Sequence, residues 1–329
     1  MTATAPRAAQ RPRTLHEVKG WFPSLDQVIF DRFLSRQKRL GQRGDLLEMG
    51  AYMGKSAIFT AGYLRVDERF TVCDLFDAPA PDERNAAEAR KSYATLTRVA
   101  FEQNYLAFHD ELPDVVQGPT SLVPDHVAPD SCRFVHVDAS HLYEHVAGDI
   151  DAAHTALVPT GVVVLDDFRS EHTPGVAAAT WEAVFLRGLR PVCLTTQKLY
   201  GTWGDPEPLQ EELLADEEWR AGTHLSVQEI AGQRVLRFSG RPPNLAAPRS
   251  LPQLPLGGAP SRRDPRVRHR GRPVPAGPPG RGVRGVRAAP PQPGAQTRGG
   301  RPAAGRDARD PPQGRQAVKG PVFGGGGRG

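Results

Sequence analysis

Acidic residues follow the predicted apolar strands at four places along the chain. They are Glu48, Asp74, Asp138 and the adjacent pair Asp166 and Asp167. In a parallel sheet the carboxyl ends of the strands meet at one edge, and ligands bind there. Burying several carboxylates close together costs free energy unless a cation or hydrogen-bond donors compensate. The repeated acids at this edge therefore indicate a site and are not explained by stability.

The first acid begins a turn that contains two glycines. Glu48 is followed by Met-Gly-Ala-Tyr-Met-Gly-Lys-Ser, so Gly50 and Gly54 allow a sharp turn and a close approach to a ligand. The third glycine of the dinucleotide fingerprint G-x-G-x-x-G is missing, which disfavours a nicotinamide oxidoreductase. The glycine spacing is also too short for a Walker A loop. Asp74 follows Glu48 by 26 residues and is suited to accept two ribose hydroxyls.

Short apolar strands alternate with helical segments along most of the chain. This order predicts an α/β fold with a doubly wound, mostly parallel seven-stranded sheet covered on both faces. The predicted strands are 46–49, 70–73, 115–117, 134–137, 162–165, 192–195 and 235–238. The predicted helices begin at a capping box of Ser24 and Gln27 and continue at 56–64, 83–105, 142–157 and 176–188. Residues 205–222 are predicted to be a surface insertion.

The charge of the chain is divided between two regions. Residues 241–329 hold 17 Arg, one Lys and three acids, a formal charge of +15, whereas the first 240 residues carry −10. The last 89 residues also contain 18 Pro and 18 Gly and only one aromatic residue, Phe323. Such a composition buries too little apolar surface to offset the entropy of ordering. We predict a flexible N-terminus (1–20), one globular domain (21–240) and a disordered tail (241–329).

Several classes of protein are excluded by the composition. The longest apolar run, Val162–Leu165, is far shorter than the roughly 18 residues of a membrane helix. The N-terminus lacks the apolar region of a secretory signal, so a cytoplasmic location is expected. Cys73, Cys132 and Cys193 form no C-x-x-C pair and are predicted to be small buried hydrophobic residues.

Two groups of motifs resemble a known family. The pattern 48–56 and the strand end Val72-Cys73-Asp74 resemble motif I and the second-strand acid of class I S-adenosylmethionine-dependent methyltransferases. Residues 137–149 and 157–168 resemble a subfamily with a D-x-x-H-x-Y segment and a G-x-x-x-x-D-D strand end. That subfamily includes macrolide-sugar O-methyltransferases of the macrocin type and relatives of cephalosporin-pathway enzymes. The resemblance covers about residues 22–200, and Thr160 departs from the glycine more common there.

The resemblance implies a Rossmann-like methyltransferase fold and a role for each motif residue. The residues expected to bind the cofactor S-adenosyl-L-methionine are Glu48, Gly50, Gly54 and Ser56 along its methionine part, Asp74 at the ribose, and Gly118 and Ser121 near the adenine. Asp138, Asp166 and Asp167 are expected to bind a divalent metal, and His141 is the expected base.

The chemistry of methyl transfer agrees with these assignments. Transfer from a sulfonium is an in-line displacement that needs an aligned, deprotonated acceptor oxygen. Three carboxylates form a hard oxygen site suited to Mg²⁺, which lowers the pKa of a bound hydroxyl. His141 follows Asp138 by three residues, so one turn can bring a proton-accepting imidazole to the same pocket.

The sequence thus predicts a cytoplasmic, Mg²⁺-assisted O-methyltransferase acting on a small-molecule hydroxyl. The resemblance alone implies that this hydroxyl belongs to a natural product or its sugar. No membrane partner is expected. The charge of −10 argues against nucleic acid as the substrate of the folded domain, and relatives often form homo-oligomers. One alternative is a non-catalytic cofactor-binding or regulatory protein of the same fold. Another is a nucleic-acid-associated protein acting through the basic tail. A sequence dominated by Arg, Pro, Gly and Ala, like this tail, is also what a shifted reading frame in GC-rich coding DNA encodes.

Further residues near the motifs have weaker assignments. Tyr52 and the Trp21-Phe22 pair are candidates to line an acceptor pocket, and Glu171 or His172 is a candidate substrate contact or alternative base. His136 is predicted to be a buried strand residue. Tyr143 is predicted to belong to the core, and His109, His145 and His154 to the surface.

Overall fold

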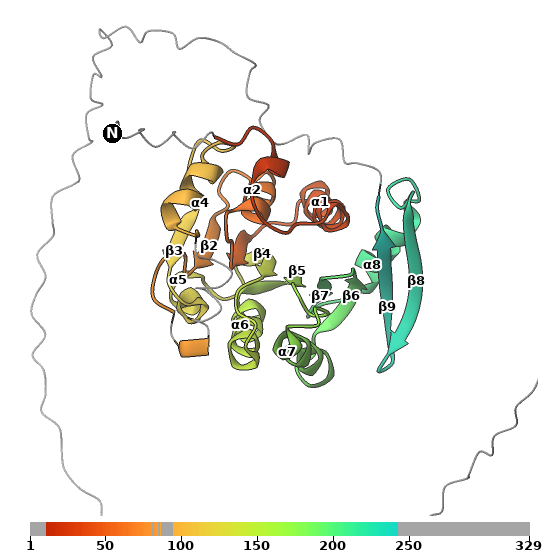
Figure 1. The fold of residues 1–329 in the computed structure, drawn as a ribbon. Coiled ribbons are helices and arrows are strands. Elements are labelled where there is room, and N and C mark those ends of the chain that lie inside the picture. Colours follow the sequence, from red (N-terminus) through yellow and green to blue (C-terminus); the bar gives the residue numbers. More distant parts are fainter. Residues whose placement is uncertain (1–10, 81, 85, 87–94, 243–329) are drawn as a thin grey trace, which may run out of the picture. The chain divides into compact units, whose positions relative to one another are not determined.

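One mixed sheet runs through the residues that this computed structural model describes, which are 11–80, 82–84, 86 and 95–242. Its strand order is β3-β2-β1-β4-β5-β7-β6-β9-β8. Strands β3 to β5 in this order are all parallel, so their carboxyl ends share one edge (Figure 1). The strands are β1 (Asp45–Met49), β2 (Phe70–Asp74), β3 (Asp114–Gln117), β4 (Cys132–Val137), β5 (Leu157–Leu165), β6 (Arg190–Leu194), β7 (Leu199–Thr202), β8 (Thr223–Ile230) and β9 (Gln233–Gly240).

The sheet has nine strands among the described residues, so the prediction of seven is wrong in number. The two strands that the apolar runs did not indicate are β7, which is antiparallel to both β5 and β6, and β8. β8 pairs only with β9, as an antiparallel hairpin that extends the sheet beyond β6. The predicted α/β class and mostly parallel centre are confirmed.

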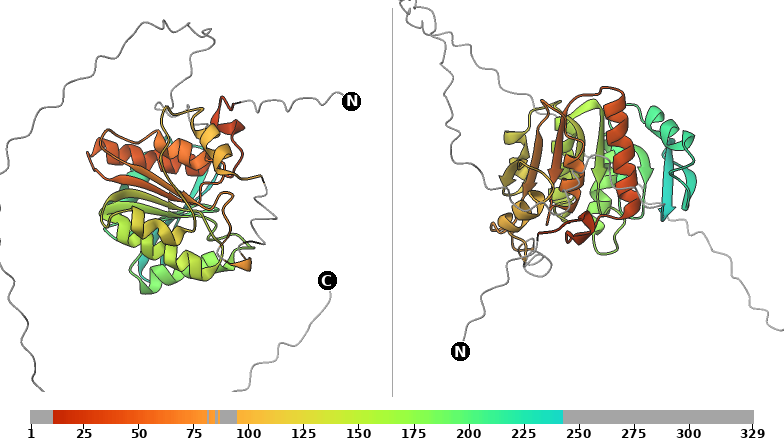
Figure 2. Two further views of the ribbon diagram at one scale, coloured as in Figure 1. Left: turned by 90° about the vertical axis from the view of Figure 1, so that its left-hand side faces the viewer. Right: turned by 90° about the horizontal axis from the view of Figure 1, so that it is seen from above.

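Helices cover both faces of the sheet, as expected. They are α1 (Ser24–Arg39), α2 (Lys55–Ala61), α4 (Arg98–Tyr105), α5 (Val123–His126), α6 (Tyr143–Ala156), α7 (Pro174–Leu186) and α8 (Glu207–Ala215), with the 3-10 turns η1 (Leu15–Glu17) and η2 (Thr120–Leu122). Figure 2 shows helices on each side of the sheet. Successive residues of one strand enter opposite cores: Val162 packs with α1 and α2, whereas Val163 packs with α6 and α7. This alternation is the period of two that a strand imposes on its side chains.

Two local predictions are corrected by the helices. Pro23, not Ser24, precedes α1, no side chain caps that helix, and the Gln27 amide donates to the carbonyl of Phe22 at 2.8 Å instead. Residues 205–222 are not a mere surface insertion, because α8 lies within them and buries Leu209 and Leu213 against the core.

The predicted division of the chain lies partly outside the described residues. The tail from 243 and residues 1–10 fall there, as do 85 and 87–94 of the predicted helix 83–105. Packing begins before residue 21, because Val18 is 1% exposed. The three cysteines are buried and free, as predicted. Within the described part of the chain, every helix is too short or too polar to cross a membrane.

The turn after β1 depends on a glycine. Gly50 has φ +83°, and a Cβ atom there would lie 2.0 Å from the carbonyl oxygen of Asp138. Gly41 has φ +65° but open space around it. Gly41→Ala should therefore lower the free energy of unfolding by about 1 kcal/mol, the cost of the left-handed backbone alone. Gly50→Ala should lower it by about 3 kcal/mol, because the clash adds to that cost. Urea denaturation of both variants measures the difference, and equal losses would contradict this account of the turn.

Candidate functional site

A cavity of about 890 Å³ opens where the carboxyl ends of five strands meet. One residue at or just after each of these strands lines it: Gly50, Asp74, Gly118, Asp138 and Asp166. The expectation that the strand-end acids share one edge is confirmed for three of these positions. The volume is within the range of sites that bind cofactor-sized ligands.

Asp74 is held firmly in the wall of this cavity. Its Oδ2 accepts hydrogen bonds from the backbone amides of Ala51 (2.7 Å) and Tyr52 (2.9 Å), and its Oδ1 accepts one from Phe76 (2.6 Å). Burial raises the pKa of Asp74, and the three backbone donors act against that rise. The carboxylate thereby fixes the turn after β1 and still faces the cavity.

Three of the residues predicted to contact the cofactor lie outside the cavity wall. Glu48 is fully buried below it and accepts hydrogen bonds from the Ser56 hydroxyl and from Nδ1 of His136, the latter at 2.9 Å. Gly54 has φ +90°, and a Cβ atom there would lie 3.1 Å from the ring of Phe101. These positions have structural roles here, and their predicted contact with the cofactor stays a prediction.

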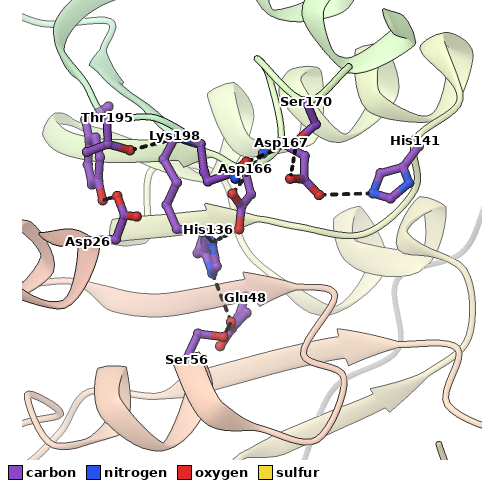
Figure 3. A network of polar contacts seen from close by, with 12 residues as sticks. Asp26, Glu48, Ser56, His136, His141, Asp166, Asp167, Ser170, Thr195 and Lys198 are labelled. Atoms are coloured by element: carbon purple, nitrogen blue, oxygen red, sulfur yellow. Dashed lines mark hydrogen bonds and ion pairs between the residues drawn. The ribbon is translucent and has the colours of Figure 1, made fainter. Parts of the chain in front are cut away.

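His141 and Asp167 form a pair on the cavity wall. Nε2 of His141 lies 3.3 Å from Oδ2 of Asp167, and the Ser170 hydroxyl donates to Oδ1 of Asp167 at 2.7 Å (Figure 3). Burial by itself raises the pKa of Asp167, but the hydrogen bonds from His141 and Ser170 bring it below its ordinary value. Asp167 is also held at φ +55°, an uncommon backbone conformation that accompanies functional sites. The arrangement suits an imidazole that accepts a proton beside a carboxylate that stabilises the resulting cation.

The three predicted metal ligands are not brought together as one set. Potential ligand atoms of His136, Asp138 and Asp166 lie within 4.8 Å of one another, whereas Asp167 is engaged by His141. Lys198, which is 1% exposed, contacts this group: its ammonium donates to Oδ2 of Asp166 and lies 3.3 Å from Nε2 of His136. His136 is buried in β4, as predicted. Burial raises the pKa of Asp138 to about 6.

The far part of the wall contains a carboxylate to which the sequence assigned no role. Asp149 on α6 is 3% exposed and accepts a hydrogen bond from the Thr120 hydroxyl. Its Oδ2 has no partner among the described residues, although it lines the cavity beside Gly118 and Ser121. Burial raises the pKa of Asp149 to about 6. Buried polar atoms are almost always hydrogen-bonded, so this oxygen indicates a ligand donor.

Aromatic and imidazole side chains complete the rim. Trp21 stacks on Tyr52 with ring centroids 5.5 Å apart, and both line the cavity, whereas Phe22 is buried in the core. His172 also lines it and meets the His141 ring edge-on at 5.9 Å.

Two of the weaker assignments were wrong. His145, predicted to be a surface residue, lines the cavity and hydrogen-bonds Ser140 at 2.9 Å. Tyr143, predicted to belong to the core, is 37% exposed and donates to Glu182 outside the cavity. Nothing in the local sequence distinguished these two side chains.

Comparison with known proteins gives one match in sequence. Residues 47–168 match the family model described as "Methyltransferase domain". The matched segment begins in β1 and ends just after the Asp166-Asp167 pair, so it includes the carboxyl ends of β1 to β5. No curated protein matches the chain.

Several solved structures of low sequence identity match part of this chain. The O-methyltransferase NovP is 18% identical over 55% of this chain and 81% of its own, with a TM-score of 0.44. CalS11, a TDP-rhamnose 3′-O-methyltransferase in calicheamicin biosynthesis, is 20% identical over 55% and 80%, with a TM-score of 0.37. TomG from Streptomyces achromogenes is 18% identical over 57% and 92%, with a TM-score of 0.34. Likenesses at this level say nothing about the substrate of this chain.

The segment that matches the family model supplies the residues at the strand ends that line the cavity. Residues 47–168, which supply the strand ends of β1 to β5, are thus similar to a methyltransferase domain.

Proposed function

We propose that this protein is a methyltransferase that transfers the methyl group of S-adenosylmethionine to a hydroxyl of a small molecule, such as a natural product or its sugar. The observation that carries the proposal is the presence of Asp74, Asp149 and the His141–Asp167 pair on the wall of a single cavity. The first two offer acceptors to a nucleoside, and the pair offers a base to an acceptor alcohol.

The nucleoside part of the cofactor is assigned to the end of the cavity formed by β2 and β3. Asp74 retains about one lone pair for a ribose hydroxyl, because three backbone amides occupy the other acceptor sites of the carboxylate. The unpartnered oxygen of Asp149 is suited to accept a hydrogen bond from the exocyclic amino group of adenine. Gly118 and Ser121 lie in the same wall, so adenine would sit beside them as the sequence predicted.

The acceptor is assigned to the part of the cavity near His141. A lone pair of the hydroxyl oxygen attacks the methyl carbon, the carbon–sulfur bond breaks, and its electron pair leaves on sulfur as a neutral thioether. The hydroxyl proton passes to His141, and Asp167 stabilises the imidazolium. The stacked rings of Trp21 and Tyr52 at the rim offer an apolar surface to an acceptor. Trp21 is 71% exposed, which is consistent with a surface that a substrate covers.

The predicted assistance by Mg²⁺ is not included in this proposal. The oxygens of Asp166 already accept from the Lys198 ammonium and from the amide of Asp167, the latter at 2.8 Å. Asp167 in turn accepts from His141 and Ser170. Of the three predicted metal ligands, Asp138 is therefore the one whose carboxylate forms no hydrogen bond or ion pair with the described residues.

The assignment of Asp74 is tested by calorimetric titration of S-adenosylmethionine into the full chain. Asp74→Ala should weaken binding by at least about tenfold, because the hydrogen bond that a ribose hydroxyl donates to a charged acceptor is lost. Asp110→Ala, at an exposed position outside the cavity, serves as the matched control and should bind like the parent. Unchanged affinity of Asp74→Ala, with the fold intact by circular dichroism, would show that the nucleoside lies elsewhere.

The assignment of Asp149 predicts a pH dependence. Its pKa of about 6 means that much of the carboxyl is protonated at pH 5, where an adenine amino group cannot use it as a full acceptor. Affinity for S-adenosylmethionine should therefore rise as the pH increases from 5 to 7, by up to about tenfold per pH unit below the pKa. Asp149→Asn should bind more weakly at pH 7 and show a flatter profile. Asp138 titrates in the same range in both proteins, so the difference between the two profiles isolates Asp149. Parallel profiles would refute the assignment.

A further inference from the structure

A buried lysine lies within the acidic group that the sequence assigned to a metal. Lys198 is carried by the turn between β6 and β7, where its backbone amide donates to the Thr195 hydroxyl at 2.9 Å and its carbonyl accepts from the Thr195 amide at 2.9 Å. From this turn the side chain is directed toward Asp166 and His136 (Figure 3). The ammonium contacts both of these residues.

The protons of this network can be assigned from the hydrogen-bonding capacity of each group. An ammonium has donors only, so Nε2 of His136 must accept from Lys198 across 3.3 Å. The remaining ring proton is then on Nδ1, which donates to Glu48 at 2.9 Å. In this arrangement the lone pair of Nε2 of His136 is directed at Lys198. That lone pair is the one a metal would need.

Asp166 is engaged in the same way. One oxygen accepts from Lys198, and the other accepts from the backbone amide of Asp167 at 2.8 Å. A divalent ion bound between His136, Asp138 and Asp166 would have to displace the Lys198 ammonium from Asp166 and from His136. The ion and the displaced ammonium would still lie close to each other. Like charges at such separations repel strongly in a buried environment. The residues present therefore do not fit a metal ion in this group.

We propose that the ammonium of Lys198 is the permanent cation of the group His136, Asp138 and Asp166, and that this group binds no divalent metal. Burial lowers the pKa of Lys198, while the negative charges of Asp138, Asp26 and Glu48 act in the opposite direction. A cation that is covalently attached to the chain compensates the buried carboxylates at the cost of its own hydration.

The contact between Lys198 and Asp166 also bears on the position of Asp167. It fixes Asp166, whose second oxygen holds the amide of Asp167. Asp167 is thereby kept at φ +55°, with its carboxylate directed at His141. The Lys198 ammonium thus holds Asp166, and Asp166 holds the backbone amide of Asp167, whose carboxylate contacts His141. Lys198 itself does not line the cavity.

The test is binding of Mn²⁺ to the full chain, measured by the electron paramagnetic resonance signal of the free ion after removal of metals with EDTA and desalting. The wild-type protein should show no site that depends on Asp138. Lys198→Ala removes the ammonium and leaves the carboxylates, so it should gain one site per chain, at least about tenfold tighter than any wild-type site. Its melting temperature should rise on addition of Mn²⁺, whereas that of the wild type should not.

Controls separate this result from nonspecific effects. Lys38→Ala, at an exposed position on α1, should behave like the wild type. The double variant Lys198→Ala, Asp138→Asn should lose the gained site. A wild-type Mn²⁺ site that Asp138→Asn abolishes would overturn the proposal, even if Lys198→Ala fails to fold. A folded Lys198→Ala variant that gains no site would overturn it as well.

This inference does not rest on the proposed methyl transfer, because Mn²⁺ binding is measured without cofactor or acceptor. Failure of S-adenosylmethionine to bind would remove the proposed function and leave the role of Lys198 standing. A metal site in the wild-type protein that depends on Asp138 would remove the proposed role of Lys198 and leave the proposed methyl transfer standing.

Discussion

Carboxylates gathered at one edge of a sheet must be compensated, because each loses hydration and each repels the others. The structure compensates them in three different ways. Asp74 receives three backbone amides, Asp166 receives a buried ammonium, and Asp167 receives an imidazole and a hydroxyl. Asp149 keeps an oxygen for which the described residues supply no donor. Glu48 also has an unpartnered oxygen but lies outside the cavity wall, so it is the combination of an unpartnered oxygen with a place in that wall that marks Asp149 as an acid facing a ligand.

The order of the strands makes this arrangement possible. Because β3, β2, β1, β4 and β5 are adjacent and parallel, residues from five separate parts of the chain reach one cavity. The antiparallel insertion of β7 beside β5 has a second effect: it places the β6–β7 turn, and with it Lys198, next to the carboxyl end of β5. A parallel strand at this position would begin at the opposite edge of the sheet.

The sequence predicted what depends on local pattern. Apolar runs located β1, β2, β4 and β5, and the acids at their ends were expected to share one edge. β7 was missed because Leu-Tyr-Gly-Thr has no run of β-branched residues, and it becomes a strand by pairing with β5 and β6. β8 was missed because it is a half-exposed edge strand.

Features that depend on distant contacts were beyond the sequence. Lys198 occurs in a polar stretch, Thr-Thr-Gln-Lys, that is typical of an exposed turn. Its burial results from partners 32 and 62 positions away. Asp149 belongs to a recognised motif, but its burial results from packing of α6 against η2. Asp167 was included among the predicted metal ligands because its contact with His141 also depends on the fold and could not be seen in the sequence.

Under the proposed function, S-adenosylmethionine binds across the carboxyl ends of β1 to β4. This placement can be tested by hydrogen–deuterium exchange of the full chain, with and without saturating S-adenosylmethionine. Binding there should slow exchange in the turns at 50–53, 74–76 and 118–121 and at the start of α6, with no change in the β8–β9 hairpin. Unchanged exchange in these turns, or protection confined to the hairpin, would contradict it.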